Sequence, residues 1–135
     1  MTIAQTQQIF EAFRIASNER WSDPEAMVAL YSDAGAAAAY GSRDAMRHAE
    51  TAWRIAFPNW RRDFTRVVIG EDSFAVVSRI RATNTGPFGG RPATNREVDF
   101  EGAAFFRVSN GLIDESVVVG QEALAATLND QLGLK

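Results

Sequence analysis

The sequence predicts an α+β fold in which helices come first and an antiparallel sheet follows. Apolar residues recur at helical spacing up to residue 57, whereas β-branched and aromatic residues dominate from residue 65 to residue 120. Short turn sequences join consecutive strand segments, which is typical of a meander. A chain of 135 residues with 46% hydrophobic side chains is expected to form a single domain, residues 1–135, with one core.

Three helices are expected before the sheet. The first has its apolar residues on one stripe, at helical spacing. The capping box Ser22-Asp23-Pro24-Glu25 predicts a short second helix that runs to about Tyr31. The third follows Ser42 and ends at Phe57-Pro58, because proline disfavours a helical conformation in the residue before it. Its inner face is formed by Met46, Ala49, Trp53 and Ala56.

Four strands are expected next, at residues 65–69, 74–83, 97–108 and 112–120. Gly70-Glu71-Asp72 and Ser109-Asn110-Gly111 are expected to form hairpin turns, the second of which carries the Asn-Gly pair favoured in two-residue loops. A last helix, with leucines one turn apart, is expected to end at Gly133.

Alternation along the strands separates two faces of the sheet. One face of residues 97–108 is almost wholly apolar, while the other carries Asp99 and Glu101 opposite Arg79 and Arg81 of the preceding strand. The helices must cover the apolar face. A bent sheet beneath helices leaves a cavity, and such cavities are usual ligand sites.

Charge and composition exclude several classes of function. Fourteen basic against seventeen acidic side chains give a net charge of −3, so no nucleic-acid partner is expected. The chain has no cysteine and one histidine, His48, which excludes thiolate sites and any metal site that needs two imidazoles. No apolar run approaches the roughly twenty residues of a membrane helix, and residues 1–20 lack a leader pattern. A cytoplasmic protein without a membrane partner is expected.

Three motifs occur in order: Phe57-Pro58-Asn59-Trp60, Ala82-Thr83-Asn84-Thr85-Gly86, and a strand pattern from Val98 through Phe105-Phe106-Arg107-Val108 to Ile113. This ordered set resembles the SnoaL-like polyketide cyclase family. That family belongs to the nuclear transport factor 2-like superfamily, which includes ketosteroid isomerase. The resemblance implies a cone-shaped, curved antiparallel sheet wrapped by N-terminal helices, also called a cystatin-like roll. It further implies a buried pocket, a homodimer and no metal or organic cofactor.

The chain departs from the family at the positions that carry its chemistry. Where the resemblance places an acidic residue in the last strand, this sequence has Val118. The expected histidine on the preceding strand is Ala104, and a further histidine is replaced by Asn84. The resemblance therefore carries over the fold, but not the family's acid–base pair.

Four residues are candidates for catalysis. Asn84 could donate a hydrogen bond to an oxyanion, or it could equally be a turn residue that caps the following loop. Asp114 is the best carboxylate candidate, although it follows a hairpin near the expected rim. Tyr31 and Ser116 could donate hydrogen bonds. His48 is interpreted as a surface residue, since it lies off the apolar stripe of its helix.

The pocket is expected to be lined by aromatic, small and polar side chains from the helices, the inner strand faces and a glycine-rich loop at residues 85–95 that could act as a flap. The candidates are Tyr40, Trp53, Trp60, Ser78, Phe88, Phe100, Ala104, Phe106 and Val118.

Three functions remain open from the sequence. The chain could be a cofactor-independent enzyme that cyclises, isomerises or dehydrates a hydrophobic polyketide- or terpenoid-like intermediate. It could be a non-catalytic binding protein of the same fold, or an assembly module that uses the outer face of the sheet. A dimer is expected through that outer face, where Val77 and Phe105 interrupt the charged ladder.

Overall fold

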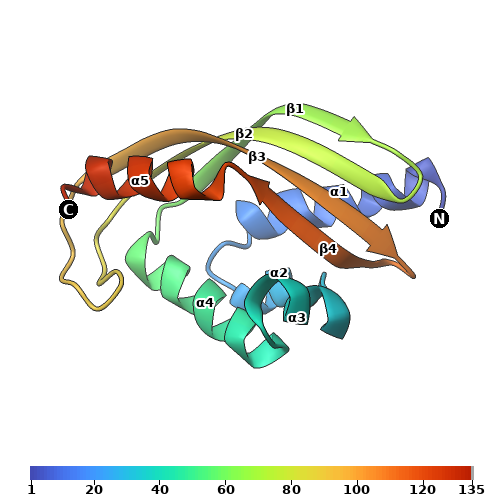
Figure 1. Ribbon diagram of the computed structural model, residues 1–135, viewed down its shortest axis with the longest axis horizontal. Coiled ribbons are helices and arrows are strands. Elements are labelled where there is room, and N and C mark those ends of the chain that lie inside the picture. Colours follow the sequence, from blue (N-terminus) through green and yellow to red (C-terminus); the bar gives the residue numbers. More distant parts are fainter. Residues whose placement is uncertain (135) are drawn as a thin grey trace.

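The computed structural model describes residues 1–134. Four helices come first, α1 (Ile3–Ser17), α2 (Pro24–Val28), α3 (Asp33–Tyr40) and α4 (Arg43–Ala56). The strands β1 (Arg61–Ile69), β2 (Ser73–Thr83), β3 (Glu97–Ser109) and β4 (Leu112–Val119) follow, and α5 (Gln121–Leu132) ends the described chain. The strands form one curved antiparallel sheet in the order β1-β2-β3-β4, which does not close (Figure 1). The α+β class and the curved sheet are confirmed.

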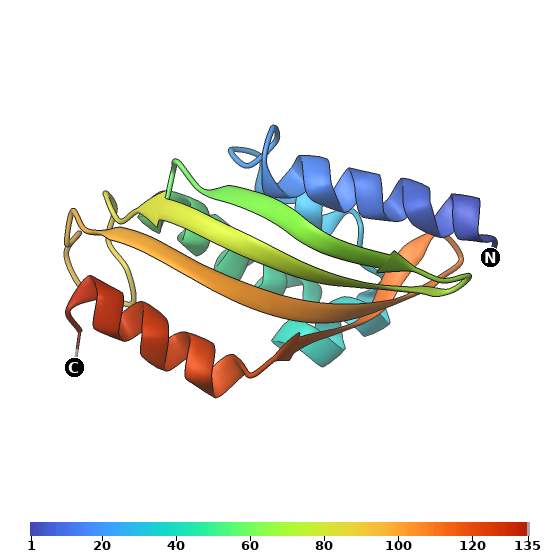
Figure 2. The same cartoon turned by 90° about the horizontal axis from the view of Figure 1, so that it is seen from above.

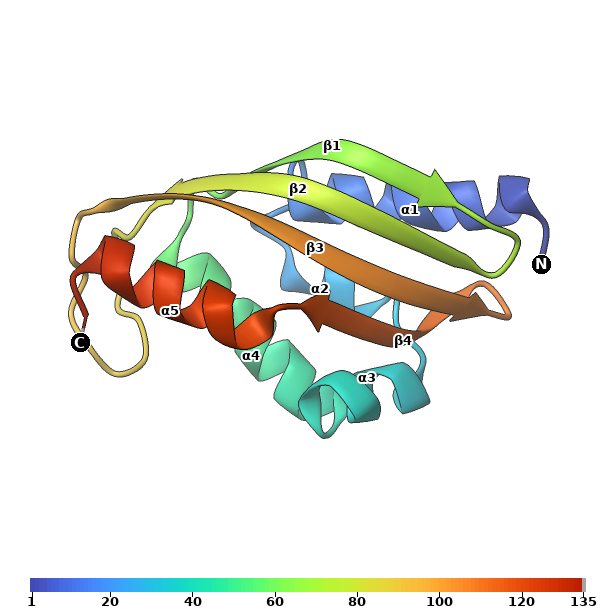
Figure 3. The ribbon, with the colours of Figure 1, turned by 45° about the horizontal axis from the view of Figure 1, so that its top comes forward.

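The helices gather on the concave side of this sheet. In Figure 3, α3 and α4 lie beneath the sheet, and α5 runs alongside β3. Seen from above, α1 follows β1 and α5 follows β3, so that the two helices flank the sheet on opposite sides (Figure 2). Among residues 1–134, no helix is both long enough and apolar enough to cross a membrane.

The capping residues place the helix starts where the sequence predicts them. Asp23 accepts a hydrogen bond from the backbone of Glu25 at the start of α2, and Ser42 accepts one from Ala45 at the start of α4. The second helix ends at Val28, three residues before the predicted end. The backbone beyond Val28 pairs with β4 instead. The carbonyl of Leu30 accepts a hydrogen bond from the N–H of Ile113, and the N–H of Ser32 donates one to the carbonyl of Ile113.

Helix α3 is an element that the sequence analysis did not include. Ser32 caps it by accepting a hydrogen bond from Gly35, and an alanine run continues it. Gly35 allows the helix to press against β4, since a Cβ at this position would lie 2.3 Å from the carbonyl oxygen of Ile113. The helix thereby brings Tyr40, at its C-terminal end, to the concave side of the sheet.

The two faces of the central strands follow the predicted alternation. On the inner face Val76 pairs with Ala104 and Ile80 with Phe100, while the outer face pairs Arg79 with Glu101 and Arg81 with Asp99. Inner-face phenylalanines form the main core with α1. Phe74 and Phe106 stack with their ring centroids 4.6 Å apart.

Strand β1 begins at Arg61, four residues before the predicted start. Its first residues pair with the end of β2, Arg61 opposite Arg81 and Arg62 opposite Ile80. A register shift between Phe64 and Arg66 then reverses the facing of the rest of the strand. The earlier start places Arg62 on the inner face, above the helices.

Helix α5 covers the part of β3 that β4 is too short to reach. The side-chain amide of Gln131 accepts from the backbone N–H of Asp99 and donates to its carbonyl, at 2.8 and 2.7 Å. This amide satisfies the groups that a neighbouring strand would otherwise pair, which protects the sheet edge. Leu124 packs against the inner-face Gly102, so that α5 also forms one wall of the space beneath the sheet. The predicted end at Gly133 is confirmed by its left-handed backbone.

Candidate functional site

A cavity of about 620 Å³ lies between the concave face of the sheet and helices α3, α4 and α5. Most of its wall is apolar, and its polar groups come from a few side chains. Seven of the nine residues expected to line a pocket do so, as does the catalytic candidate Ser116: Tyr40, Trp53, Trp60, Phe88, Phe100, Ala104 and Val118. The size and the mainly apolar lining suit a small hydrophobic molecule.

Aromatic rings form one end of this cavity. Trp53 of α4 lies with its ring 5.3 Å from Phe88 of the glycine-rich loop, measured between centroids. Trp60 lies 6.2 Å from Phe100 of β3 and stacks on Trp21, 5.0 Å away. Phe88 is therefore already packed into the wall in this structure, as part of the partly buried aromatic cluster around Phe57.

A tyrosine–carboxylate pair, Tyr40 and Glu50, defines the polar end of the cavity. Tyr40 lines the cavity, and its hydroxyl donates a hydrogen bond of 2.9 Å to Oε1 of Glu50. Nη1 of Arg54 donates to the other carboxylate oxygen at 2.7 Å. Glu50 and Arg54 are 9% and 7% exposed, so this is a buried ion pair. The Arg54 guanidinium stacks over Trp21 at 4.1 Å, and its Nε and Nη2 have no hydrogen-bond partner among residues 1–134.

Arg62 is a second, partly buried cation, and it lines the cavity itself. Its Nε donates to the Ser78 hydroxyl at 2.9 Å, and its guanidinium lies 5.1 Å from the ring centroids of Phe13 and Phe64. Within residues 1–134, no carboxylate lies within ion-pair distance of it. Burial lowers the pKa of Arg62 to about 10, which leaves it charged at neutral pH.

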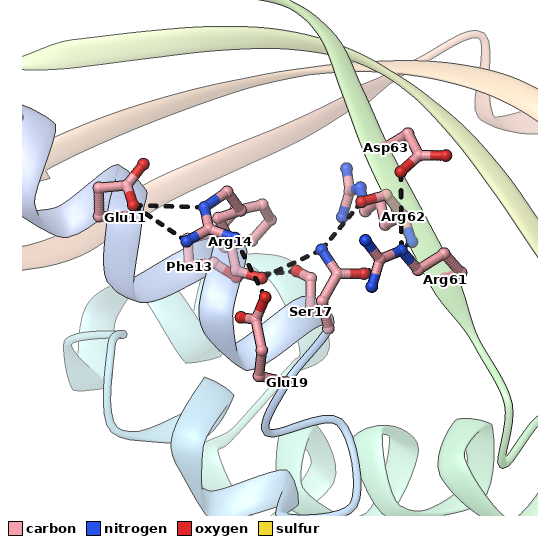
Figure 4. Close-up of polar contacts among 9 residues, drawn as sticks. Glu11, Phe13, Arg14, Ser17, Glu19, Arg61, Arg62 and Asp63 are labelled. Carbon is pink, nitrogen blue, oxygen red and sulfur yellow. Dashed lines mark hydrogen bonds and ion pairs between the residues drawn. The ribbon is translucent and has the colours of Figure 1, made fainter.

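The backbone of Arg62 is held by the end of α1. Asn18 accepts a hydrogen bond of 2.8 Å from the N–H of Arg62 and donates one of 2.9 Å to its carbonyl. Figure 4 shows this junction, with the neighbouring Arg61 paired to Asp63 rather than to the helix. The two adjacent arginines therefore point to opposite faces of the sheet, and only Arg62 reaches the cavity.

Both tyrosines of the chain are buried in this region and stay protonated at neutral pH. Burial raises the pKa of Tyr31 to about 12, and its side-chain hydrogen bond with Ser116 partly opposes the shift. Burial and the adjacent Glu50 carboxylate raise the pKa of Tyr40 as well. Tyr31 lies behind Ser116 and does not line the cavity, whereas Ser116 does.

Asn84 is fully buried outside the cavity wall, and its amide is fully occupied. Its Nδ2 donates to the carbonyls of Ala56 and Gly86, at 3.1 and 2.9 Å. Its Oδ1 accepts from the backbone N–H and the hydroxyl of Thr94, at 2.9 and 3.0 Å. No amide proton is left for a substrate oxyanion. These contacts match the alternative interpretation from the sequence, in which Asn84 caps and anchors the loop that follows it.

Three further candidates lie apart from the cavity wall. Asp114 sits beside Gly35 of α3, next to an irregularity in the β3–β4 pairing, and its Oδ1 is buried without a partner among the described residues. Ser78 is buried and accepts from Arg62. Phe106 packs into the core against Phe74. His48 is exposed on α4, as its place off the apolar stripe indicates.

Sequence reasoning missed Glu50, Arg54 and Arg62. Glu50 follows Met46 by four residues, so it belongs to the inner stripe of α4, and a charged residue on that stripe is the available signal. Arg62 alternates with Phe64, which places both on one face once the strand is known to begin at Arg61. No group of three or more metal-ligating side chains converges anywhere in residues 1–134.

A model of the SnoaL-like polyketide cyclases matches residues 4–128. The chain belongs to this family. No curated protein sequence matches it. Among solved structures, TsrD from Streptomyces laurentii is 22% identical over 98% of this chain and 97% of its own, with a TM-score of 0.77. A SnoaL-like polyketide cyclase from Agrobacterium tumefaciens is 17% identical over 95% and 98%, with a TM-score of 0.66. A protein with a ketosteroid isomerase-like fold from Catenulispora acidiphila is 15% identical over 96% and 95%, with a TM-score of 0.71. These likenesses show the fold.

The SnoaL-like cavity of this chain is apolar where the resemblance predicts the acid and the histidine. Ala104 and Val118 are paired neighbours on β3 and β4, and both line the cavity. The polar side chains of the cavity wall come instead from other positions, namely Tyr40 of α3, Arg62 of β1, Ser116 of β4, and Gln121 and Asn129 of α5. Glu50 of α4 is connected to this set through its hydrogen bond with Tyr40.

Proposed function

We propose that this SnoaL-like domain is a cofactor-independent enzyme that forms an enolate from a hydrophobic, polyketide-like ketone and so promotes its cyclisation. The observation that carries the proposal is the Tyr40–Glu50 hydrogen bond, because it brings a buried carboxylate into contact with the cavity through one hydroxyl. Isomerisation and dehydration of a related carbonyl compound pass through the same enolate, so they draw on the same groups.

The proton would move through Tyr40 without leaving a charge on it. The substrate carbon gives its α-proton to the Tyr40 oxygen as the Tyr40 hydroxyl proton passes to Oε1 of Glu50. The raised pKa of Tyr40 favours this concerted transfer over a free tyrosinate. The Ser116 hydroxyl lines the same cavity and can donate to the enolate oxygen. The enolate carbon then attacks a second carbonyl of the substrate, and the proton held by Glu50 returns to the new alkoxide.

The aromatic end of the cavity supplies orientation. Ring closure needs two carbonyl-bearing segments of one chain to be held face to face, and flat apolar walls favour the folded conformer. Trp53, Trp60 and Phe100 provide such walls, opposite the leucines of α5.

Exchange of the α-protons of 2-tetralone in D₂O, followed by NMR, tests the proposal. The wild-type protein is expected to accelerate exchange, and Tyr40→Phe to lower the rate by about a hundred-fold, as expected for loss of a general acid–base group. Tyr31→Phe is the matched control, since it removes the other buried tyrosine hydroxyl without changing the cavity wall. Equal exchange rates for wild type and Tyr40→Phe would contradict the mechanism.

A non-catalytic binding protein is the second candidate. Apolar Ala104 and Val118, at the positions where relatives are expected to carry acid and histidine, favour it. A binding protein would bind 2-tetralone without accelerating its exchange. The same NMR experiment therefore separates the two functions.

We further propose that two copies associate through the outer face of the sheet. Apolar residues from all four strands lie next to one another there, with Val68, Val117 and Val119 69%, 48% and 58% exposed. Val77 and Phe105 connect them across the central strands. An isologous dimer would bury this row. Sedimentation equilibrium at micromolar protein is expected to show a dimer, and an exclusively monomeric protein would leave this face to a different partner, as in an assembly module.

A further inference from the structure

We propose that the ligand of this cavity carries an acidic oxygen, as a carboxylate or an acidic enol, and that Arg62 binds it. The inference rests on the proposed function in that it concerns the same cavity. It goes further because it names the chemical class of the ligand and the residue that selects it.

The balance of buried charge points to a missing anion. Three charged side chains gather near the polar end. Glu50 and Arg54 are buried, and Arg62 is partly buried in the cavity wall. Glu50 and Arg54 neutralise each other through a contact of 2.7 Å. Arg62 keeps a full positive charge with only neutral partners, the Ser78 hydroxyl and two aromatic faces. A buried charge without a counter-ion is costly, so buried cations in proteins are normally paired.

The other groups that face Arg62 cannot supply the counter-charge. Tyr31 and Tyr40 are close enough to interact with it electrostatically, but both have raised pKa values and are neutral below pH 10. Glu50 contributes attraction at longer range and is already held by Tyr40 and Arg54. Within residues 1–134 the charge of Arg62 therefore remains available to a ligand.

The geometry of the site suits an anionic oxygen. With Nε on Ser78, the Arg62 terminal nitrogens make no hydrogen bond to any of residues 1–134, and Arg62 lines the cavity. A guanidinium presents its donors as a planar fork, which matches the two oxygens of a carboxylate or of an ionised 1,3-dicarbonyl. The Ser116 hydroxyl lines the same cavity and provides a further hydrogen-bond donor.

The remaining wall defines the body of the ligand. Trp53, Trp60, Phe100, Leu124 and Leu128 enclose the rest of the space with apolar surface. A ligand that is complementary to both the apolar wall and Arg62 has a flat, mainly hydrocarbon body and one acidic group. Poly-carbonyl intermediates and aromatic acids belong to this class.

The test compares two probes of almost equal shape, 2-naphthoic acid, which is ionised at pH 7.5, and neutral 2-naphthamide. Binding to the full chain is measured by isothermal titration calorimetry, with tryptophan fluorescence as a second readout because Trp53 and Trp60 line the cavity. The acid is expected to bind the wild-type protein at least about tenfold more tightly, as for a charge-assisted hydrogen bond. Arg62→Gln is expected to abolish this preference while changing the affinity for the amide little.

Arg61→Gln is the matched control. This neighbour makes an ion pair of 3.6 Å with Asp63 and pairs across the sheet with Arg81 on the outer face, so the preference for the acid should survive. Arg62→Lys, which keeps the charge without the planar fork, should retain a reduced preference. This variant decides the matter if Arg62→Gln does not fold.

Each remaining outcome overturns a definite part of the argument. Equal affinities of wild type for acid and amide, or a preference that persists in Arg62→Gln, would overturn the role of Arg62 while the cavity remains a ligand site. Failure of both probes to bind would overturn this inference, whereas the proposed function is tested separately. The exchange of neutral 2-tetralone depends on Tyr40, so its success or failure is independent of the acid preference.

Discussion

The inner and outer faces of the sheet carry arginine in contrasting circumstances. On the outer face Arg79 is half exposed and makes two hydrogen bonds of 2.8 Å to Asp99. On the inner face Arg62 is partly buried against phenylalanine rings and has no carboxylate partner among residues 1–134. The paired arginine is stabilised by its carboxylate and says little about function, since exposed ion pairs contribute little. The unpaired, partly buried Arg62 indicates a function, because no carboxylate among the described residues compensates the cost of removing its charge from water.

The largest effect is expected when a buried charge on the inner side loses its partner. Glu50→Ala would leave Arg54 charged and buried, with Nε and Nη2 already lacking hydrogen-bond partners. We expect the free energy of unfolding to fall by about 3–5 kcal/mol, measured by urea denaturation. Asp99→Ala on the outer face also removes the partner of an arginine, but it should lower the free energy of unfolding much less, because exposed ion pairs contribute little. Similar losses for the two variants would remove the distinction between the faces.

The burial of Tyr31 and Tyr40 on the inner side of the sheet can be measured spectroscopically, through the pH at which they ionise. The raised pKa of Tyr31, about 12, means that the folded state keeps its proton while the unfolded chain, near 10, loses it. Any stability from this group is therefore complete below pH 10 and declines as the pH rises towards 12. The pKa of Arg62 is lowered in the folded state, so its effect on stability over the same pH range has the opposite sign. Tyrosinate absorbance at 295 nm is therefore a better readout than the free energy of unfolding.

At pH 11 the native protein should show only about a tenth of the Tyr31 ionisation, against about nine-tenths in the unfolded chain. Tyr40, whose pKa is also raised, should contribute little tyrosinate absorbance before unfolding. Ionisation of both groups near pH 10 in protein that keeps its native circular dichroism would contradict their burial.

Filling the cavity should weaken binding without disturbing the outer face. Ala104→Trp would project into the cavity beside Val118, and the affinity for 2-naphthamide is expected to fall by about 1–3 kcal/mol, the scale of overpacking. Ala75→Trp is the control, because this residue of β2 pairs with Phe105 on the outer face and does not line the cavity. Calorimetry distinguishes them, and unchanged affinity in a well-folded Ala104→Trp protein would place the ligand elsewhere.

The smallest expected effect concerns stability at the ligand site itself. Arg62→Met removes a partly buried charge that has no carboxylate partner, and we expect the free energy of unfolding to rise by about 1 kcal/mol while the preference for an acidic probe is lost. The Ser78 hydroxyl loses its partner, which limits the gain. Arg79→Met on the outer face should bring no such gain. A clear loss of stability in Arg62→Met would show that the arginine stabilises the fold and is not retained for binding.

Local sequence features predicted most of the fold. Alternation sorted the residues of β2 and β3 onto the correct faces, because side chains in a strand alternate strictly and the inner set is apolar. Ser42 and Asp23 located two helix starts, since a capping hydrogen bond reaches only two or three residues along the chain. Asn110 and Gly111, both with positive φ, formed the expected turn.

The polar end of the cavity could not be predicted in this way. Whether β1 begins at Arg61 or Thr65 depends on pairing with β2, because Arg61 and Arg62 have no local preference for a strand. The role of Asn84 depended on where Ala56, Gly86 and Thr94 lie around it.

The sequence by itself determined the α+β class, the faces of the central strands, the residues of the aromatic wall, and the apolar side chains Val118 and Ala104 at positions where the resemblance predicts an acid and a histidine. These are consequences of periodicity, composition and aligned motifs, which depend on neighbours along the chain. The tertiary structure alone decided that Tyr40 meets Glu50 and that Arg62 faces the cavity unpaired. Such features depend on which charges are removed from water together, and that is set by the packing of helices against the sheet.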